Sequence, residues 1–206
     1  MKLILSGGGA GDASKDVDSL FTSLLLNPTV LYIPIAMFGR KEYPYPSCLE
    51  WCNSWIKNYG DIKVTMWTEK DLENFSYEEL SKFGGIYIGG GNTFYLLSKF
   101  REFGFDKGLV KILTTTEMPI AGGSAGALIF TDTIETCTVS DTNDIGLKDI
   151  SGLKQTKGFN LAVHYEKRMD EIIMGYTRTT NSKIIAIPED SGLFINDKVY
   201  NYRGSK

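Results

Sequence analysis

Short apolar runs alternate with longer amphipathic stretches along most of the chain, and this alternation limits the fold more than any other feature. The runs predict strands at Lys2–Ser6, Val30–Ala36, Lys63–Trp67, Gly85–Ile88, Pro119–Gly122, Ile134–Val139, Asn160–His164 and Ile184–Pro188. The stretches predict helices at Ser14–Leu26, Ser47–Tyr59, Tyr77–Phe83, Thr93–Phe103, Gly108–Thr115, Ala125–Thr131 and Lys167–Thr177. Apolar runs separated by helices indicate a parallel sheet covered on both faces. We therefore expect an α/β fold, a three-layer α/β/α sandwich with a mostly parallel sheet, ending in a hairpin at Leu193–Asn196 and Val199–Tyr202.

Composition excludes several classes of function. The 206 residues, 42% of them hydrophobic, suit one domain spanning 1–206. A net charge of -3 without a basic stripe argues against nucleic acid as a partner. No apolar segment approaches the ~18 residues of a spanning helix, so we expect no membrane. With a single histidine and three cysteines that lack metal-site spacing, we expect no metal, no cofactor and a cytoplasmic protein.

The segment Gly122–Gly126 carries the pattern G-x-S-x-G between an apolar run and a helical stretch. In this context the pattern is typical of a nucleophile elbow, a strained strand-to-helix turn that exposes a serine. Ser124 would then be the nucleophile, and the Ala125 amide would lie beside a developing oxyanion. A tight turn with Ser124 as a helix N-cap is the alternative interpretation.

A second glycine turn, Gly89–Gly91, also joins an apolar run to a helix. Because ligands bind at the carboxyl ends of strands in open α/β sheets, Gly90 or Gly91 is a candidate for the second oxyanion donor. Asn92 would cap the following helix or contact the substrate. A capped turn without a role in chemistry is the alternative.

Two further segments lie outside these motifs. Ser6–Gly11 is rich in glycine but completes neither G-x-G-x-x-G, because Asp12 occupies the sixth position, nor a P-loop. We expect it to wall the site rather than to bind a nucleotide. Ser140–Lys157 is a polar surface loop that either covers the site as a lid or is simply solvated.

An activated serine needs a base and an acid that orients it. His164 is the only histidine, and it ends a predicted strand. Glu189 also follows a predicted strand, so it could converge with Ser124 and His164, and Asp190 beside it is the second choice. The chain order of α/β-hydrolases would instead select an acid between Ser124 and His164, and the candidates there are Asp132, Glu135, Asp141 and Asp144.

The run Gly89–Thr93, the elbow Gly122–Ala127, and a later histidine followed by Pro188-Glu189 together resemble the S51 serine peptidases. That family includes the aspartyl dipeptidases (dipeptidase E) and the cyanophycinases. The resemblance implies a flavodoxin-like fold similar to class I glutamine amidotransferases. It also implies a Ser-His-Glu triad, an oxyanion hole near Gly90 and Ala125, and peptide hydrolysis through an acyl-enzyme.

The substrate is less constrained than the chemistry. A small peptide is expected, cleaved by a dipeptidase or an aminopeptidase, and release of an N-terminal Asp would require a cation such as Lys167 or Arg168. A non-catalytic ligand-binding or regulatory protein, and a general amidase or esterase, are the alternative functions. The loop Tyr43–Pro46 either contacts the second subunit of a homodimer or serves the fold alone.

Overall fold

A seven-stranded sheet runs through the centre of the computed structural model, which describes residues 1–196 and 199–204. The strand order is β3-β2-β4-β5-β1-β8-β9. The five strands from β3 to β1 are parallel, and β8 and β9 extend the sheet antiparallel to their neighbours. The strands are β1 (Lys2–Ser6), β2 (Thr29–Ile33), β3 (Lys63–Met66), β4 (Gly85–Ile88), β5 (Pro119–Gly123), β8 (Ser191–Asn196) and β9 (Val199–Gly204).

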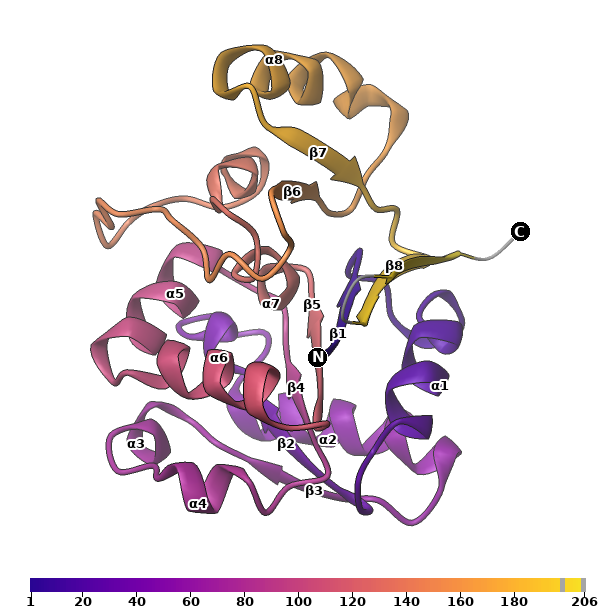
Figure 1. The fold of residues 1–206 in the computed structure, drawn as a ribbon. Helices are drawn as coiled ribbons and strands as arrows, with labels where there is room; N and C mark the ends of the chain where they lie inside the picture. Colours follow the sequence, from indigo (N-terminus) through magenta and orange to yellow (C-terminus); the bar gives the residue numbers. More distant parts are fainter. Residues whose placement is uncertain (197–198, 205–206) are drawn as a thin grey trace.

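Helices cover both faces of this sheet (Figure 1), which is the predicted three-layer arrangement. On one face lie α1 (Lys15–Ser23) and α2 (Tyr45–Ile56). On the other lie α5 (Thr93–Glu102), α6 (Phe105–Thr115) and α7 (Ala125–Leu128). Shorter helices and turns connect them: η1 (Gly11–Ala13), η2 (Ile35–Met37), η3 (Lys57–Tyr59), α3 (Glu69–Leu72), α4 (Tyr77–Leu80) and η4 (Glu135–Val139).

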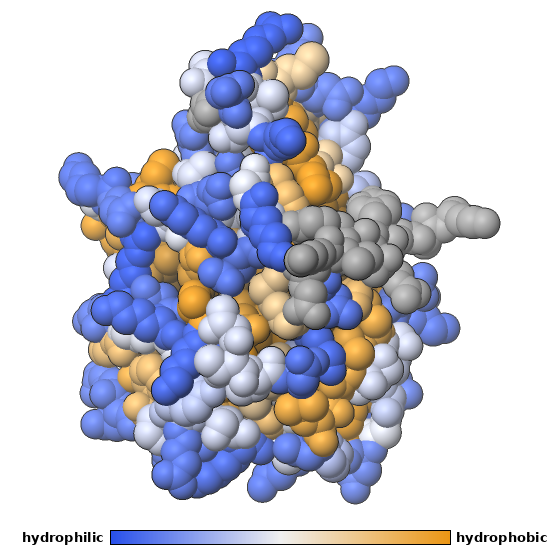
Figure 2. All heavy atoms as spheres, viewed as in Figure 1, coloured by the Kyte–Doolittle hydropathy of each residue, from blue (hydrophilic) through white to orange (hydrophobic). Residues whose placement is uncertain are grey.

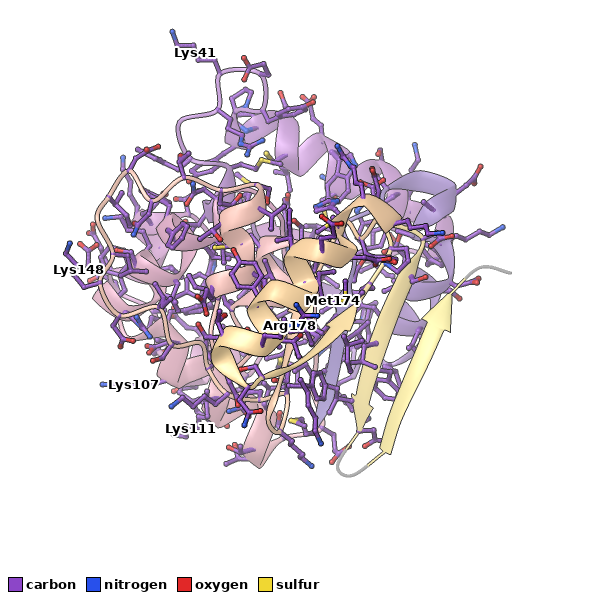
Figure 3. The ribbon with its side chains drawn as sticks, turned by 90° about the horizontal axis from the view of Figure 1, so that it is seen from above. Lys41, Lys107, Lys111, Lys148, Met174 and Arg178 are labelled. Carbon is purple, nitrogen blue, oxygen red and sulfur yellow. The ribbon has the colours of Figure 1, made fainter. Side chains whose placement is uncertain are left out.

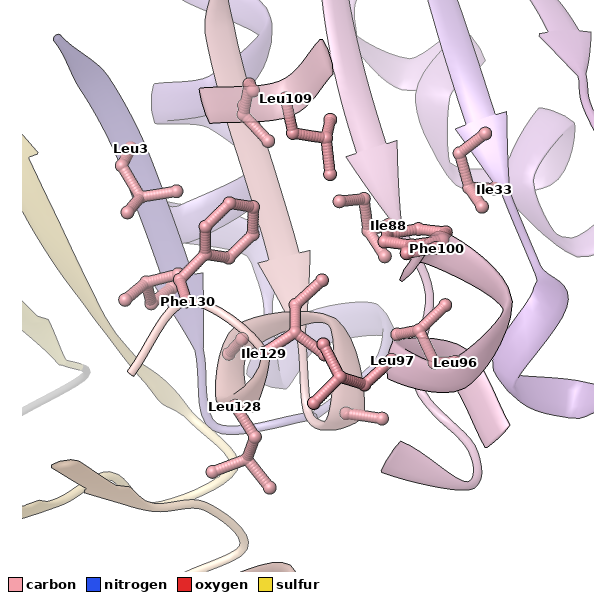
Figure 4. Packing of buried hydrophobic residues seen from close by; sticks show 14 of the residues in the cluster. Leu3, Ile33, Ile88, Leu96, Leu97, Phe100, Leu109, Leu128, Ile129 and Phe130 are labelled. Atoms are coloured by element: carbon pink, nitrogen blue, oxygen red, sulfur yellow. The ribbon is translucent and has the colours of Figure 1, made fainter. Parts of the chain in front are cut away.

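The strand register sorts the core into two parts. Successive side chains of a strand point to opposite faces, so each row of paired residues belongs to one face. One row packs under α5, α6 and α7 and consists of Ile33, Ile88, Gly122 and Leu5. Figure 4 shows aliphatic and phenylalanine side chains filling the space on this face. The adjacent row, Tyr32, Tyr87, Ala121 and Ile4, faces α1 and α2.

A second, two-stranded parallel sheet pairs β6 (Phe159–Ala162) with β7 (Lys183–Ala186). These strands are joined through η5 (Lys167–Met169) and α8 (Asp170–Thr180). The unit lies beyond the carboxyl ends of the parallel strands of the main sheet (Figure 1). It therefore brings the segments that follow β6 and β7 to the edge where ligands bind in α/β proteins.

The structure corrects several predicted elements. The strand predicted at Ile134–Val139 is wrong, because η4 occupies this segment and buries Ile134 and Cys137, three residues apart. The helix predicted at Ala125–Thr131 ends at Leu128. The turn of the predicted hairpin, at positions 197–198, lies outside the described residues.

Hydrophilic side chains cover most of the face shown in Figure 2, and apolar side chains form separate smaller areas. Within the described residues, no helix combines the length and the apolar character needed to cross a membrane.

Candidate active site

Ser124 lies at the sharp turn between β5 and α7. Its backbone has φ 52° and ψ -115°, a conformation that L-residues rarely adopt and that costs of order 1–3 kcal/mol. The turn depends on small neighbours. A Cβ on Gly122 would lie 2.1 Å from the Gly126 carbonyl oxygen, and one on Gly126 would lie 2.3 Å from that of Ile88. The geometry is that of a nucleophile elbow.

His164 follows β6 and faces the elbow. Its Nε2 is 2.7 Å from Ser124 Oγ. The histidine backbone also has a positive φ, 52°, and its amide donates to the Gly7 carbonyl over 2.9 Å. The imidazole lies directly on Gly8, where a Cβ would be 2.3 Å from its Cε1. Glycine at this position therefore makes room for the ring.

Glu189 follows β7 and completes a hydrogen-bonded chain. Its Oε1 accepts from His164 Nδ1 over 2.8 Å. The Glu189 carbonyl accepts from the Gly9 amide over 3.1 Å, so the glycine-rich segment after β1 bonds the backbones of both His164 and Glu189. Asp190, the second choice of acid, accepts instead from Ser191 Oγ over 3.0 Å.

The residues predicted to supply the oxyanion hole lie next to Ser124. A Cβ on Gly90 would lie 3.1 Å from Ser124 Cβ and 3.6 Å from its Oγ. Ala125 is the first residue of α7. Within the described residues, the amides of Gly90, Gly91 and Ala125 donate no hydrogen bond to another protein group. They are available to a carbonyl oxygen bound beside Ser124.

Asn92 has a structural role at the start of α5. Its Oδ1 accepts from the Tyr95 amide over 2.9 Å, and its Nδ2 donates to the Thr142 carbonyl over 2.8 Å. Asp141 lies close by, accepting from the amide and the hydroxyl of Thr93 over 2.8 and 2.6 Å. The start of the loop predicted at Ser140–Lys157 is thus tied to α5 beside the oxyanion donors.

A cavity of about 700 Å³ opens over Ser124 and His164. Gly8, Gly9 and Ala10 line one part of it, as expected for a wall, and the loop between η2 and α2 lines another. That loop projects from the molecule at Lys41 (Figure 3). Tyr43, Ser140 and Asp141, which the sequence analysis named for other roles, also line the cavity. Lining residues that the sequence analysis did not single out are Tyr32, Met37, Arg40, Glu42, Ser47, Cys48, Trp51 and Tyr87.

Arg168 does not fit the substrate-binding role predicted for it. Its side chain is 80% exposed, its Nε is 2.6 Å from Glu166 Oε2, and it does not line the cavity. Arg168 lies in η5, a short helix without a buried residue. Apart from His164, Arg40 is the basic residue among the described residues that line the cavity.

The arrangement can transfer a proton from the hydroxyl of Ser124 to His164 while Glu189 holds the imidazole. The fold and this site define the class: an α/β sandwich with a serine nucleophile elbow and the hydrogen-bonded chain that serine hydrolases use. Comparison with known families makes the class specific, because the model of peptidase family S51 matches residues 3–202. The chain belongs to peptidase family S51.

Individual relatives agree with this family. The chain is 32% identical over 118 residues to the uncharacterized peptidase Lin0382 of Listeria innocua, a match that covers 56% of this chain and 54% of the relative. It thus spans about half the length of that curated relative. The fold is similar to a candidate peptidase E protein of Listeria monocytogenes EGD-e, with a TM-score of 0.74, 25% identity, and coverage of 100% and 98% of the two chains. A peptidase from an acI-B1 actinobacterium shares the fold, with a TM-score of 0.71, 18% identity, and coverage of 99% and 87%.

Proposed function

We propose that the chain is a serine peptidase that hydrolyses small peptides as a dipeptidase or an aminopeptidase, releasing the N-terminal residue through a Ser124-His164-Glu189 triad. The observation that carries the proposal is the unbroken hydrogen-bonded chain from Ser124 Oγ to His164 Nε2, and from His164 Nδ1 to Glu189, over 2.7 and 2.8 Å. Each contact is within the range for proton transfer and orientation.

The proposed reaction has two steps. Ser124 Oγ attacks the peptide carbonyl as His164 takes its proton, and the oxyanion accepts hydrogen bonds from Gly90 and Ala125. Collapse of this intermediate breaks the C–N bond, and His164 returns the proton to the leaving amine. Water then attacks the acyl-enzyme with His164 again as base, which releases the N-terminal residue and restores Ser124.

The cavity favours small substrates with a free amino terminus. Its volume, about 700 Å³, suits a dipeptide or a short peptide better than a folded protein segment. Two carboxylates line it, on Glu42 and Asp141. A carboxylate within reach of the scissile bond would pair with the α-ammonium of the substrate. The three buried, unpaired cysteines fit action in a reducing compartment, and we propose the cytoplasm.

The test is hydrolysis of X-Leu dipeptides, with X as Asp, Glu, Asn, Ala, Leu, Phe or Arg, by the wild type and by Ser124→Ala. Cleavage of at least one dipeptide that is lost in Ser124→Ala supports the proposal. Cleavage that survives in Ser124→Ala contradicts the triad. A failure to cleave any dipeptide, together with Ser124-dependent turnover of simple esters, would assign the site to an esterase instead.

A further inference from the structure

One wall of the active-site cavity is aromatic. Tyr32 and Tyr87 are directly paired on β2 and β4 and project from the sheet towards α2. Trp51 of α2 closes the group, with ring centroids 6.3 Å from Tyr32 and 6.2 Å from Tyr87. Trp51 is 38% exposed although its neighbours on the helix, Cys48 and Trp55, are buried. An exposed indole beside two cavity-lining phenol rings is apolar surface available to a ligand.

Small residues connect this wall to Ser124. Ala121 and Gly123 lie on the same face of β5, because they are two residues apart in one strand. A Cβ on Gly123 would lie 3.3 Å from Tyr87 Oη, and one on Gly89 would lie 3.3 Å from Tyr32 Oη. Larger residues at these two positions would fill the space between the aromatic rings and the nucleophile. The glycines thus keep a path open from Ser124 to the aromatic wall.

The electrostatics of this wall disfavour a negatively charged side chain. The faces of aromatic rings carry partial negative charge. Behind the rings, the carboxyl group of Asp18 is buried and acts on Tyr87, whose pKa is raised above its ordinary value first by burial and then by Asp18. Glu42 and Asp141 add carboxylates to the same cavity, against the single guanidinium of Arg40. An Asp side chain against the rings would lose its hydration, and the one guanidinium of the cavity is outnumbered by its two carboxylates.

The sheet order decides which part of a substrate meets the wall. β5, which carries Ser124 at its end, lies between β4 and β1 (Figure 1). His164 contacts the segment after β1, whereas the aromatic wall stands on β4 and β2. The leaving amine must face His164, because it receives its proton from that ring. The side chain on the acyl side of the scissile bond therefore extends towards the aromatic rings.

We infer that the aromatic wall formed by Tyr32, Trp51 and Tyr87 is the pocket for the N-terminal side chain of the substrate, and that it selects large, uncharged apolar or aromatic residues such as Phe, Leu and Met over Asp. The inference rests on the proposed function, since it names the substrate class of the same site.

The test measures binding rather than turnover, so it does not depend on the chemistry. Phe-Leu, Ala-Leu, Asp-Leu and Arg-Leu are titrated into Ser124→Ala by calorimetry. Burial of a benzyl group against three rings predicts that Phe-Leu binds at least ~30-fold more tightly than Ala-Leu or Asp-Leu. Equal affinities, no measurable affinity for Phe-Leu, or tighter binding of Asp-Leu or Arg-Leu would overturn the inference. Failure of the proposed function is a separate result, namely hydrolysis that does not depend on Ser124.

Variants test whether the affinity for Phe-Leu depends on the aromatic wall. Trp51→Ala, in the Ser124→Ala background, should weaken Phe-Leu binding by at least ~10-fold and change Ala-Leu binding by less than ~2-fold. Phe38→Ala is the matched control. Phe38 is also an exposed aromatic residue on the neighbouring loop, but it stacks on Tyr95, with ring centroids 4.5 Å apart, and does not line the cavity. Equal losses in the two variants would contradict the assignment, and thermal melting shows whether each variant remains folded.

Discussion

At the scale of single residues, the site contains two adjacent acids, and only one of them contacts His164. Glu189→Gln keeps the shape of the side chain but removes the charge that stabilises an imidazolium. We expect kcat to fall by ~100-fold to ~10,000-fold with the fold retained. Asp190→Asn is the control, because Asp190 accepts from Ser191, and kcat should stay within ~3-fold of the wild type. Steady-state kinetics on the dipeptide that is cleaved fastest compare the two variants. A larger loss of kcat in Asp190→Asn than in Glu189→Gln would identify Asp190 as the triad acid instead.

Gly8 supports the imidazole, and its replacement tests that contact. In Gly8→Ala a methyl group would collide with His164 Cε1, so the ring must move and kcat should fall by ~10-fold to ~100-fold. Gly11→Ala shares the cost of a positive φ, but nothing lies within 4 Å of its Cβ position. Its kcat should be nearly unchanged. Similar kinetics for both variants would show that His164 does not depend on this contact.

The residues of the site differ in how far the sequence could predict them. Ser124, His164 and Glu189 each follow an apolar run, so the sequence predicts each of them at a strand end. The sequence does not show that Ser124 follows a strand of the main sheet whereas His164 and Glu189 follow the two strands of the second sheet. Tyr32, Tyr87 and Trp51 carry no motif. Their common pocket depends on strand register and on the face that α2 turns to the sheet, and both are set only when the chain packs.

At the scale of elements, the N-terminus of α5 is coupled to the loop that begins at Ser140. Asp141→Ala removes a carboxylate from the Thr93 amide and hydroxyl. Loss of such a cap should lower the free energy of unfolding by ~1 kcal/mol, and kcat should fall because Gly90 and Gly91 precede this helix. Asp144→Ala, which only loses an exposed contact with Thr142, should change stability by less than ~0.5 kcal/mol. Urea unfolding and kinetics on both variants test this coupling. Equal free energies of unfolding for the two variants would refute it.

The predicted strands of the main sheet agree with the structure better than the elements around the site do. Apolar runs at β1, β2, β4 and β5 are buried on both faces, so composition alone marks them. The segment Ile134–Val139 is less apolar, and its β-branched residues alone predict a strand, but Thr136 Oγ1 donates to the Leu161 carbonyl and the chain forms a 3-10 helix. Such a long-range contact leaves no periodic signal in the sequence.

At the scale of the whole molecule, the buried carboxyl group of Asp18 makes stability depend on pH. Burial raises the pKa of Asp18 from 3.8 to about 6, against the opposing hydrogen bond from Ser14. The folded state thus binds the proton more tightly than the unfolded state. The stabilisation is complete below about pH 4 and is lost as pH rises to about 6, at a cost of up to about 3 kcal/mol.

Asp18→Asn removes this titration while keeping an oxygen that can accept from Ser14. Its free energy of unfolding, relative to the wild type, should therefore increase between pH 4 and pH 7. Urea unfolding of both proteins at several pH values measures the difference. A difference that is constant across this range would mean that Asp18 does not titrate with a raised pKa.

The central claim is that Ser124 is a nucleophile activated by His164. The most direct measurement is mass spectrometry of the intact protein after reaction with a small fluorophosphonate, followed by peptide mapping. We expect one added phosphonyl group, located on Ser124, with labelling abolished in Ser124→Ala and slowed at least ~100-fold in His164→Ala. An unlabelled wild-type Ser124, or labelling at an equal rate without His164, would contradict it.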